Sequence, residues 1–120
     1  MTKPESPLTG TVFDLATAER ELRQDDAYAH SGHAARTLII EPDLRIVLVA
    51  MRTGSRIREH RADETASIYA LSGHLRLNVS NKVHELRAGQ LLVLEGGVRH
   101  DVEAGADSAF LLTLGWRKAQ

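Results

Sequence analysis

Short runs of apolar or alternating residues, separated by turn residues, make up most of the chain after residue 35. Alternation with a period of two is typical of strands, and the spacing leaves no room for a helix between successive runs. Turn signals such as Ser72-Gly73 and Gly96-Gly97 separate the runs. The pattern predicts an all-β sandwich or barrel. The predicted strands cover residues 37–41, 45–52, 56–60, 67–71, 75–79, 91–94, 98–104 and 109–114.

In the residues before these strands, the apolar positions repeat at a different spacing. Val12, Leu15, Ala18 and Leu22 recur at helical spacing, which predicts one short amphipathic helix over residues 12–23. The polar residues 25–35 that follow predict a loop leading to the first strand. We therefore divide the chain into a leader, helix and loop at 1–35 and a β-domain at 36–116.

Two of the predicted strands, at 45–52 and 109–114, are apolar on both faces. In the first, Val47 and Val49 alternate with Leu48 and Ala50. A strand with one face in water would not show this pattern. One face can fill the interior of the barrel, and the other must be covered by the N-terminal helix or by a second subunit. From this pattern we predict a homodimer.

Composition narrows the function classes. The 120 residues suit one domain, and 15 basic against 16 acidic residues create no field that would attract nucleic acid or an anionic membrane. Without cysteine, the chain has no disulfide and no thiolate ligand, so a metal would depend on histidine and carboxylate. No export signal or membrane-length apolar stretch is visible. These features predict a cytoplasmic protein.

The stretch 54–104 resembles the two sequence motifs of the cupin superfamily, mainly in its spacing. The matching positions are Gly54, His60 and Gly73 in the first motif and Gly89, Gly97 and His100 in the second. The resemblance implies a double-stranded β-helix, or jelly-roll, barrel, here preceded by a short N-terminal helix.

The resemblance also implies a location for a site. In metal-binding cupins, three histidines and a glutamate point into the barrel, where they suit iron, manganese, nickel or zinc. This chain keeps His60 and His100, but Ala62 and Ala66 stand at the other two ligand positions. A stable metal site would need a third donor, for which Glu64 is the nearest candidate. The alternative is that Glu64 belongs to a solvated loop.

His60 and His100 are expected on strands far apart in the sequence, facing each other across the barrel. Alternation places Arg58 on the same face as His60, unless a β-bulge intervenes. We predict a pocket formed by these three residues with Ala62 and Ala66, suited to a small anionic or hydroxylated ligand. Alternatively, Arg58 keeps its charge in solvent at the rim.

Two other functions remain open. One alternative is a metal-dependent cupin enzyme of the oxygenase or isomerase type. The other is a dimeric sensing or interaction module whose cavity is filled by side chains. The catalytic residues, the reaction and the ligand are not identified by the sequence.

Overall fold

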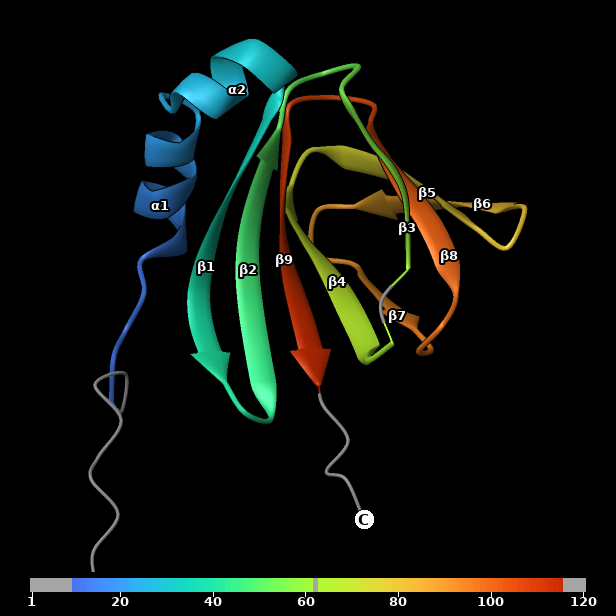
Figure 1. The fold of residues 1–120 in the computed structure, drawn as a ribbon. Helices are drawn as coiled ribbons and strands as arrows, with labels where there is room; N and C mark the ends of the chain where they lie inside the picture. The colour runs from blue at the N-terminus through green and yellow to red at the C-terminus, as the bar shows by residue number, and fades with distance from the viewer. Residues whose placement is uncertain (1–9, 62, 116–120) are drawn as a thin grey trace, which may run out of the picture.

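The structure, a computed structural model, describes residues 10–61 and 63–115 (Figure 1). It begins with two short helices, α1 (Leu15–Leu22) and α2 (Asp26–Ser31), and continues with strands only. The strands are β1 (His33–Glu41), β2 (Leu44–Met51), β3 (Arg56–Arg61), β4 (Thr65–Ser72), β5 (His74–Val79), β6 (Lys82–Arg87), β7 (Leu91–Leu94), β8 (Arg99–Ala104) and β9 (Ser108–Gly115). Strand β6 was not among the strands that the sequence predicted.

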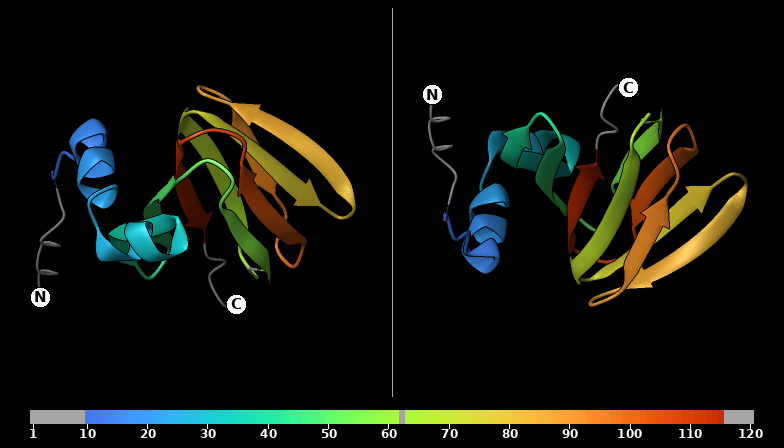
Figure 2. Two further views of the ribbon diagram at one scale, coloured as in Figure 1. Left: turned by 90° about the horizontal axis from the view of Figure 1, so that it is seen from above. Right: turned by 90° about the horizontal axis from the view of Figure 1, so that it is seen from below.

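The strands form two antiparallel sheets that face each other (Figure 2). The five-stranded sheet has the order β1-β2-β9-β4-β7, and the four-stranded sheet has the order β3-β8-β5-β6. Strands that are distant in the sequence, such as β2 and β9, pair side by side along their full length. The all-β jelly-roll with an N-terminal helix is therefore confirmed.

Strand β2 shows why both of its faces are apolar. Val47 and Val49 pack in the core between the two sheets. Leu48 and Ala50, both 0% exposed, face the other way and pack against Leu22 of α1. Of the two covers expected for the second face, the N-terminal helix is the one that packs on β2, and Figure 2 shows both helices outside the five-stranded sheet.

The segment 25–35 differs from the predicted loop, because it contains α2 and the start of β1. The side chain of Asp25 accepts a hydrogen bond from the backbone of Ala27 and caps the helix, which ends at Gly32 with φ 80°. Tyr28 is the buried residue of this helix. Neither helix of the described chain is long and apolar enough to cross a membrane.

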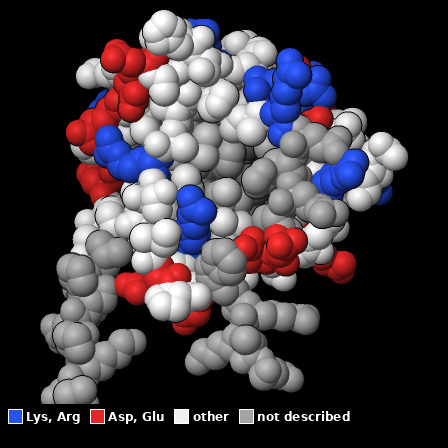
Figure 3. Space-filling view, in the orientation of Figure 1, with Lys and Arg blue, Asp and Glu red and all other residues white. Residues whose placement is uncertain are grey.

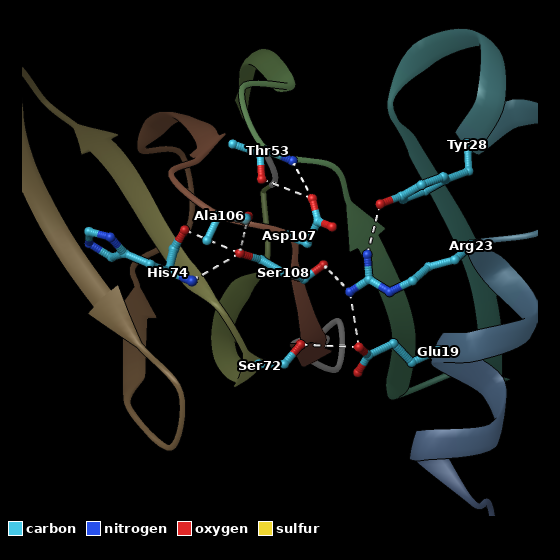
Figure 4. A network of polar contacts seen from close by, with 9 residues as sticks. All are labelled: Glu19, Arg23, Tyr28, Thr53, Ser72, His74, Ala106, Asp107 and Ser108. Atoms are coloured by element: carbon cyan, nitrogen blue, oxygen red, sulfur yellow. Dashed lines mark hydrogen bonds and ion pairs between the residues drawn. The ribbon is translucent and has the colours of Figure 1, made fainter.

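A polar network ties α1 to the end of the barrel (Figure 4). The guanidinium of Arg23 donates to Glu19 at 3.0 Å, to the hydroxyl of Tyr28 at 2.8 Å and to the carbonyl of Ser108 at 3.3 Å. The hydroxyl of Ser72 donates to the same Glu19 carboxylate at 3.2 Å. The helices are thus joined by hydrogen bonds to the last residue of β4 and to the first residue of β9.

The turn between β4 and β5 is packed closely against β9. Ser108 is fully buried, and its Oγ accepts from the backbone N–H of His74 at 2.9 Å. Gly73 adopts φ 79°, and a Cβ added there would lie 2.2 Å from that Oγ and 2.3 Å from the carbonyl oxygen of Asp107. Both the backbone angle and the space therefore require glycine at position 73.

The five-stranded sheet is one strand wider than the sheet opposite it. The extra strand, β1, pairs Ala35 with Val49 and Thr37 with Val47, so these two residues face the same side as the core of β2. Both Ala35 and Thr37 are nevertheless exposed. The inward face of β1 therefore borders an opening between the sheets.

Candidate functional site

A cavity of about 290 Å³ lies between the two sheets. Its walls are mainly apolar and come from β1, β2, β4 and β9 on one side and from β3 and β8 on the other. The apolar lining residues are Ala35, Val47, Val49, Ile57, Ile68, Val102, Phe110, Leu112 and Leu114. The size and lining suit part or all of a small organic molecule.

Four polar or charged residues also line this cavity: Arg45, Arg58, His100 and Asp101. His100 is 8% exposed, and its Nδ1 lies 3.3 Å from the carbonyl oxygen of Val98. Arg58 is exposed, so its charge remains in contact with solvent. In Figure 3, basic residues lie to either side of the recessed, uncharged centre of the face shown.

The carboxylate of Asp101 is already paired. Its Oδ2 accepts from Arg56 at 2.8 Å, and this hydrogen bond raises the pKa of the Arg56 guanidinium above its usual value. The remaining charged groups of the lining, Arg45 and Arg58, are both cationic. The cavity therefore offers a positive border and an apolar interior.

The pairing of β3 with β8 contains a bulge, and this changes the predicted faces. Ile57 pairs with Val102, and His60 pairs with His100, so β3 has one more residue than β8 over this interval. Ile57 packs against the barrel core. The predicted sharing of a face by Arg58 and His60 was conditional on an unbroken alternation, and the bulge lies between these two residues.

The same register decides where the two histidine positions lie. His60 and His100 are direct partners on adjacent strands of one sheet, not residues on opposite walls of the barrel. Only the backbone of His60 is described. Residues that are direct partners in an antiparallel pair share one face, so the two positions belong to one neighbourhood.

The other predicted site residues are distributed differently. Ala66 is 4% exposed and lies in the barrel core, in register with Leu94 and Leu114. Glu64 is half-buried in the connection between β3 and β4. Ala62 lies outside the described residues. The structure thus brings Arg58 and His100 to the cavity, while Ala66 and Glu64 are not among the residues lining it.

A second, polar depression of about 520 Å³ lies beside the first cavity. It is lined by the β5–β6 turn, including Ser80 and Asn81, and by the start of β8. His100 and Asp101 border both spaces. The buried, apolar walls single out the cavity between the sheets as the candidate binding site.

Arg45 was missed by the sequence reasoning. It stands two residues before Val47 in β2 and pairs with Leu114 of β9, a residue of the core. Its position in the alternation Arg45, Val47, Val49 was visible in the sequence. A charged residue at the start of the inward face of a strand is the signal that could have found it.

A family model described as a cupin domain matches residues 47–114 of the chain. No curated protein matches it. Among solved structures, a conserved protein of unknown function from Streptococcus pyogenes is similar, with 23% identity, a TM-score of 0.72 and coverage of 92% of this chain and 90% of that chain. An RmlC-like cupin from Shewanella frigidimarina has 18% identity and a TM-score of 0.68, covering 73% of this chain and 79% of its own.

A variant of salicylate 1,2-dioxygenase from Pseudoaminobacter salicylatoxidans in complex with gentisate has a TM-score of 0.78 at 14% identity. The match covers 86% of this chain but 32% of the dioxygenase chain. At this level of identity the similarity concerns the fold alone.

Proposed function

Since the chain belongs to the cupin superfamily, we propose that it is a small cupin that binds a small anionic or hydroxylated organic molecule inside its barrel. The observation that carries this proposal is the cavity between the sheets, with its apolar walls and its border of Arg45, Arg58 and His100. Apolar walls provide contact area for a ligand, and a few polar groups fix its orientation.

The residues of the cavity do not fit the metal centre that is common in cupins. Ala66 occupies one of the ligand positions and contributes only a methyl group to the core. Across the described part of the chain, no group of three histidine, aspartate or glutamate side chains could hold a metal ion. The two guanidinium groups in the lining would also repel a cation. A metal-free binding function therefore agrees better with the lining.

Ligand binding is tested by blocking the opening beside β1. We expect at least one of three probes at millimolar concentration, hexanoate, benzoate or xylitol, to raise the unfolding temperature of the protein. A ligand at about 100 times its Kd stabilises the folded state by about 2.7 kcal/mol. Ala35→Trp should abolish this rise, because Ala35 is exposed and lines the cavity. The change adds a bulky side chain without entering the buried core.

Val83→Trp is the matched control, because Val83 is 59% exposed on the distant strand β6. It should leave the ligand response intact. The proposal is contradicted if no probe shifts the unfolding temperature, or if Ala35→Trp responds like the wild type. Stoichiometric transition metal in protein purified without chelators would instead favour a metal-dependent enzyme.

We also propose that the chain is a homodimer, now on a different surface. The helices cover part of the outer face of the five-stranded sheet, but Tyr69, Leu91 and Val93 are exposed on β4 and β7 at 38%, 58% and 62%. Tyr69 pairs with Leu91, and Val93 lies two residues further along β7, so the three share one face. An apolar patch of this kind is typical of a subunit contact.

Light scattering coupled to size exclusion should give the mass of a dimer at micromolar concentration. The double variant Leu91→Lys, Val93→Lys should give the monomer mass, because two charges cannot be buried without partners. Val83→Lys, on the exposed part of β6, should remain dimeric. A monomer mass for the wild type rules out this proposal.

A further inference from the structure

Arg45 holds a buried polar atom without a partner. Its Nε is inaccessible to solvent and has no hydrogen-bond acceptor within the part of the chain that the structure describes. Leaving a buried donor of a charged group unpaired is costly, and more so than for a neutral group. A buried donor without a partner calls for an explanation, and the place of Arg45 in the cavity lining makes it a candidate ligand-binding residue.

Arg45 also lines the cavity, while its buried Nε is not itself exposed to that space. Arg45 shares its face of β2 with Val47 and Val49, and all three line the space between the sheets. The neighbouring strand β9 contributes Leu112 and Leu114 to the same wall. The guanidinium therefore stands at the end of an apolar surface.

The charges of the lining select the ligand class. Arg45 and Arg58 provide two positive charges, and the carboxylate of Asp101 is paired with Arg56. A guanidinium fork matches the two oxygens of a carboxylate and can bind them in a bidentate manner. The apolar walls require that the rest of the ligand be apolar as well. A sugar or polyol would lose its hydration there without compensation.

We infer that Arg45 is the anchor for the carboxylate of a monocarboxylic acid with an apolar body, and that this residue determines the ligand class of the cavity. The inference rests on the proposed function and makes it specific, since it selects the anionic ligand over the hydroxylated one. Arg58, at the exposed border, adds long-range attraction but is not the anchor.

The test compares an acid with its neutral counterpart. We expect calorimetry with 3-phenylpropanoate to show tighter binding than with 3-phenylpropanamide, which has the same apolar body without the charge. Arg45→Met should weaken binding of the acid by about 10- to 100-fold, the effect of one charge-assisted hydrogen bond. It should leave the affinity for the amide unchanged. Arg45→Lys should bind the acid with intermediate affinity, because it keeps the charge but lacks Nε and the fork.

Arg87→Met is the control, since it removes one positive charge from an exposed position at the end of β6. It should bind both probes like the wild type. Thermal unfolding without ligand provides an independent measurement. Because the buried Nε lacks a partner, Arg45→Met should unfold at the same temperature as the wild type or higher. A residue whose role was only structural would instead lower this temperature.

The failure of the inference differs from the failure of the proposed function. If the wild type binds the acid and the amide with equal affinity, and Arg45→Met leaves both affinities unchanged, the role of Arg45 is overturned but the cavity still binds ligands. Loss of stability in Arg45→Met without ligand also overturns it. If neither probe binds, and hexanoate, benzoate and xylitol do not bind either, both the inference and the proposed function are wrong.

Discussion

Gly73→Ala should lower the free energy of unfolding by about 3 kcal/mol or more. The left-handed backbone angle alone costs a residue with a Cβ about 1–2 kcal/mol, and φ is 79° at this position. The new methyl group would also lie 2.3 Å from a backbone carbonyl oxygen, that of Asp107. Overpacking of this kind costs about 1–3 kcal/mol further. Urea unfolding of the purified variant measures the sum.

Gly89→Ala separates the two contributions. Gly89 has nearly the same angle, φ 87°, but a Cβ there would meet no atom within 4 Å. It should therefore cost about 1–2 kcal/mol, the backbone part alone. Equal losses in the two variants would contradict the close packing between the β4–β5 turn and β9.

Leu22→Ala should lower the free energy of unfolding by about 2–5 kcal/mol, the usual effect of a leucine truncated in a core. Leu22 is 1% exposed and packs with Leu48 between α1 and the outer face of β2. We expect the variant to keep a single unfolding transition that coincides for circular dichroism and fluorescence.

Val12→Ala is the control, because Val12 precedes the same helix and is 92% exposed. It should change stability by less than about 0.5 kcal/mol. An early, separate transition in Leu22→Ala, with barrel unfolding unchanged, would show that α1 is an independent unit and would contradict its place in the fold.

The barrel could be predicted because its strands follow the simple period of two and are bounded by clear turns. Strand β6 escaped the prediction because its sequence places only Leu86 in the core, while Lys82 and Val83 are exposed. Helix α2 escaped because it has six residues and buries one side chain, Tyr28. Its caps, Asp25 and Gly32, were the available signals.

The candidate site was predicted only in part. His100 could be placed because its strand alternates regularly, with Val102 on the same buried face. The adjacency of His60 and His100 could not be predicted, because it depends on strand pairing and on a bulge that leaves no trace in residue type. The pairing of Arg56 with Asp101 depends on two strands brought together by the fold. Such partners cannot be inferred from spacing along the chain.

The unequal width of the two sheets has a kinetic consequence. The five-stranded sheet has one strand more than the sheet opposite it, and Ala35 of that strand, β1, is exposed and lines the cavity, so the cavity is open at this side. A guest molecule can then enter and leave without separation of paired strands or local unfolding, which are slow events in closed interiors. The association rate of the ligand should accordingly be governed by diffusion to this entrance, and its residence time by the contacts that it makes inside the cavity.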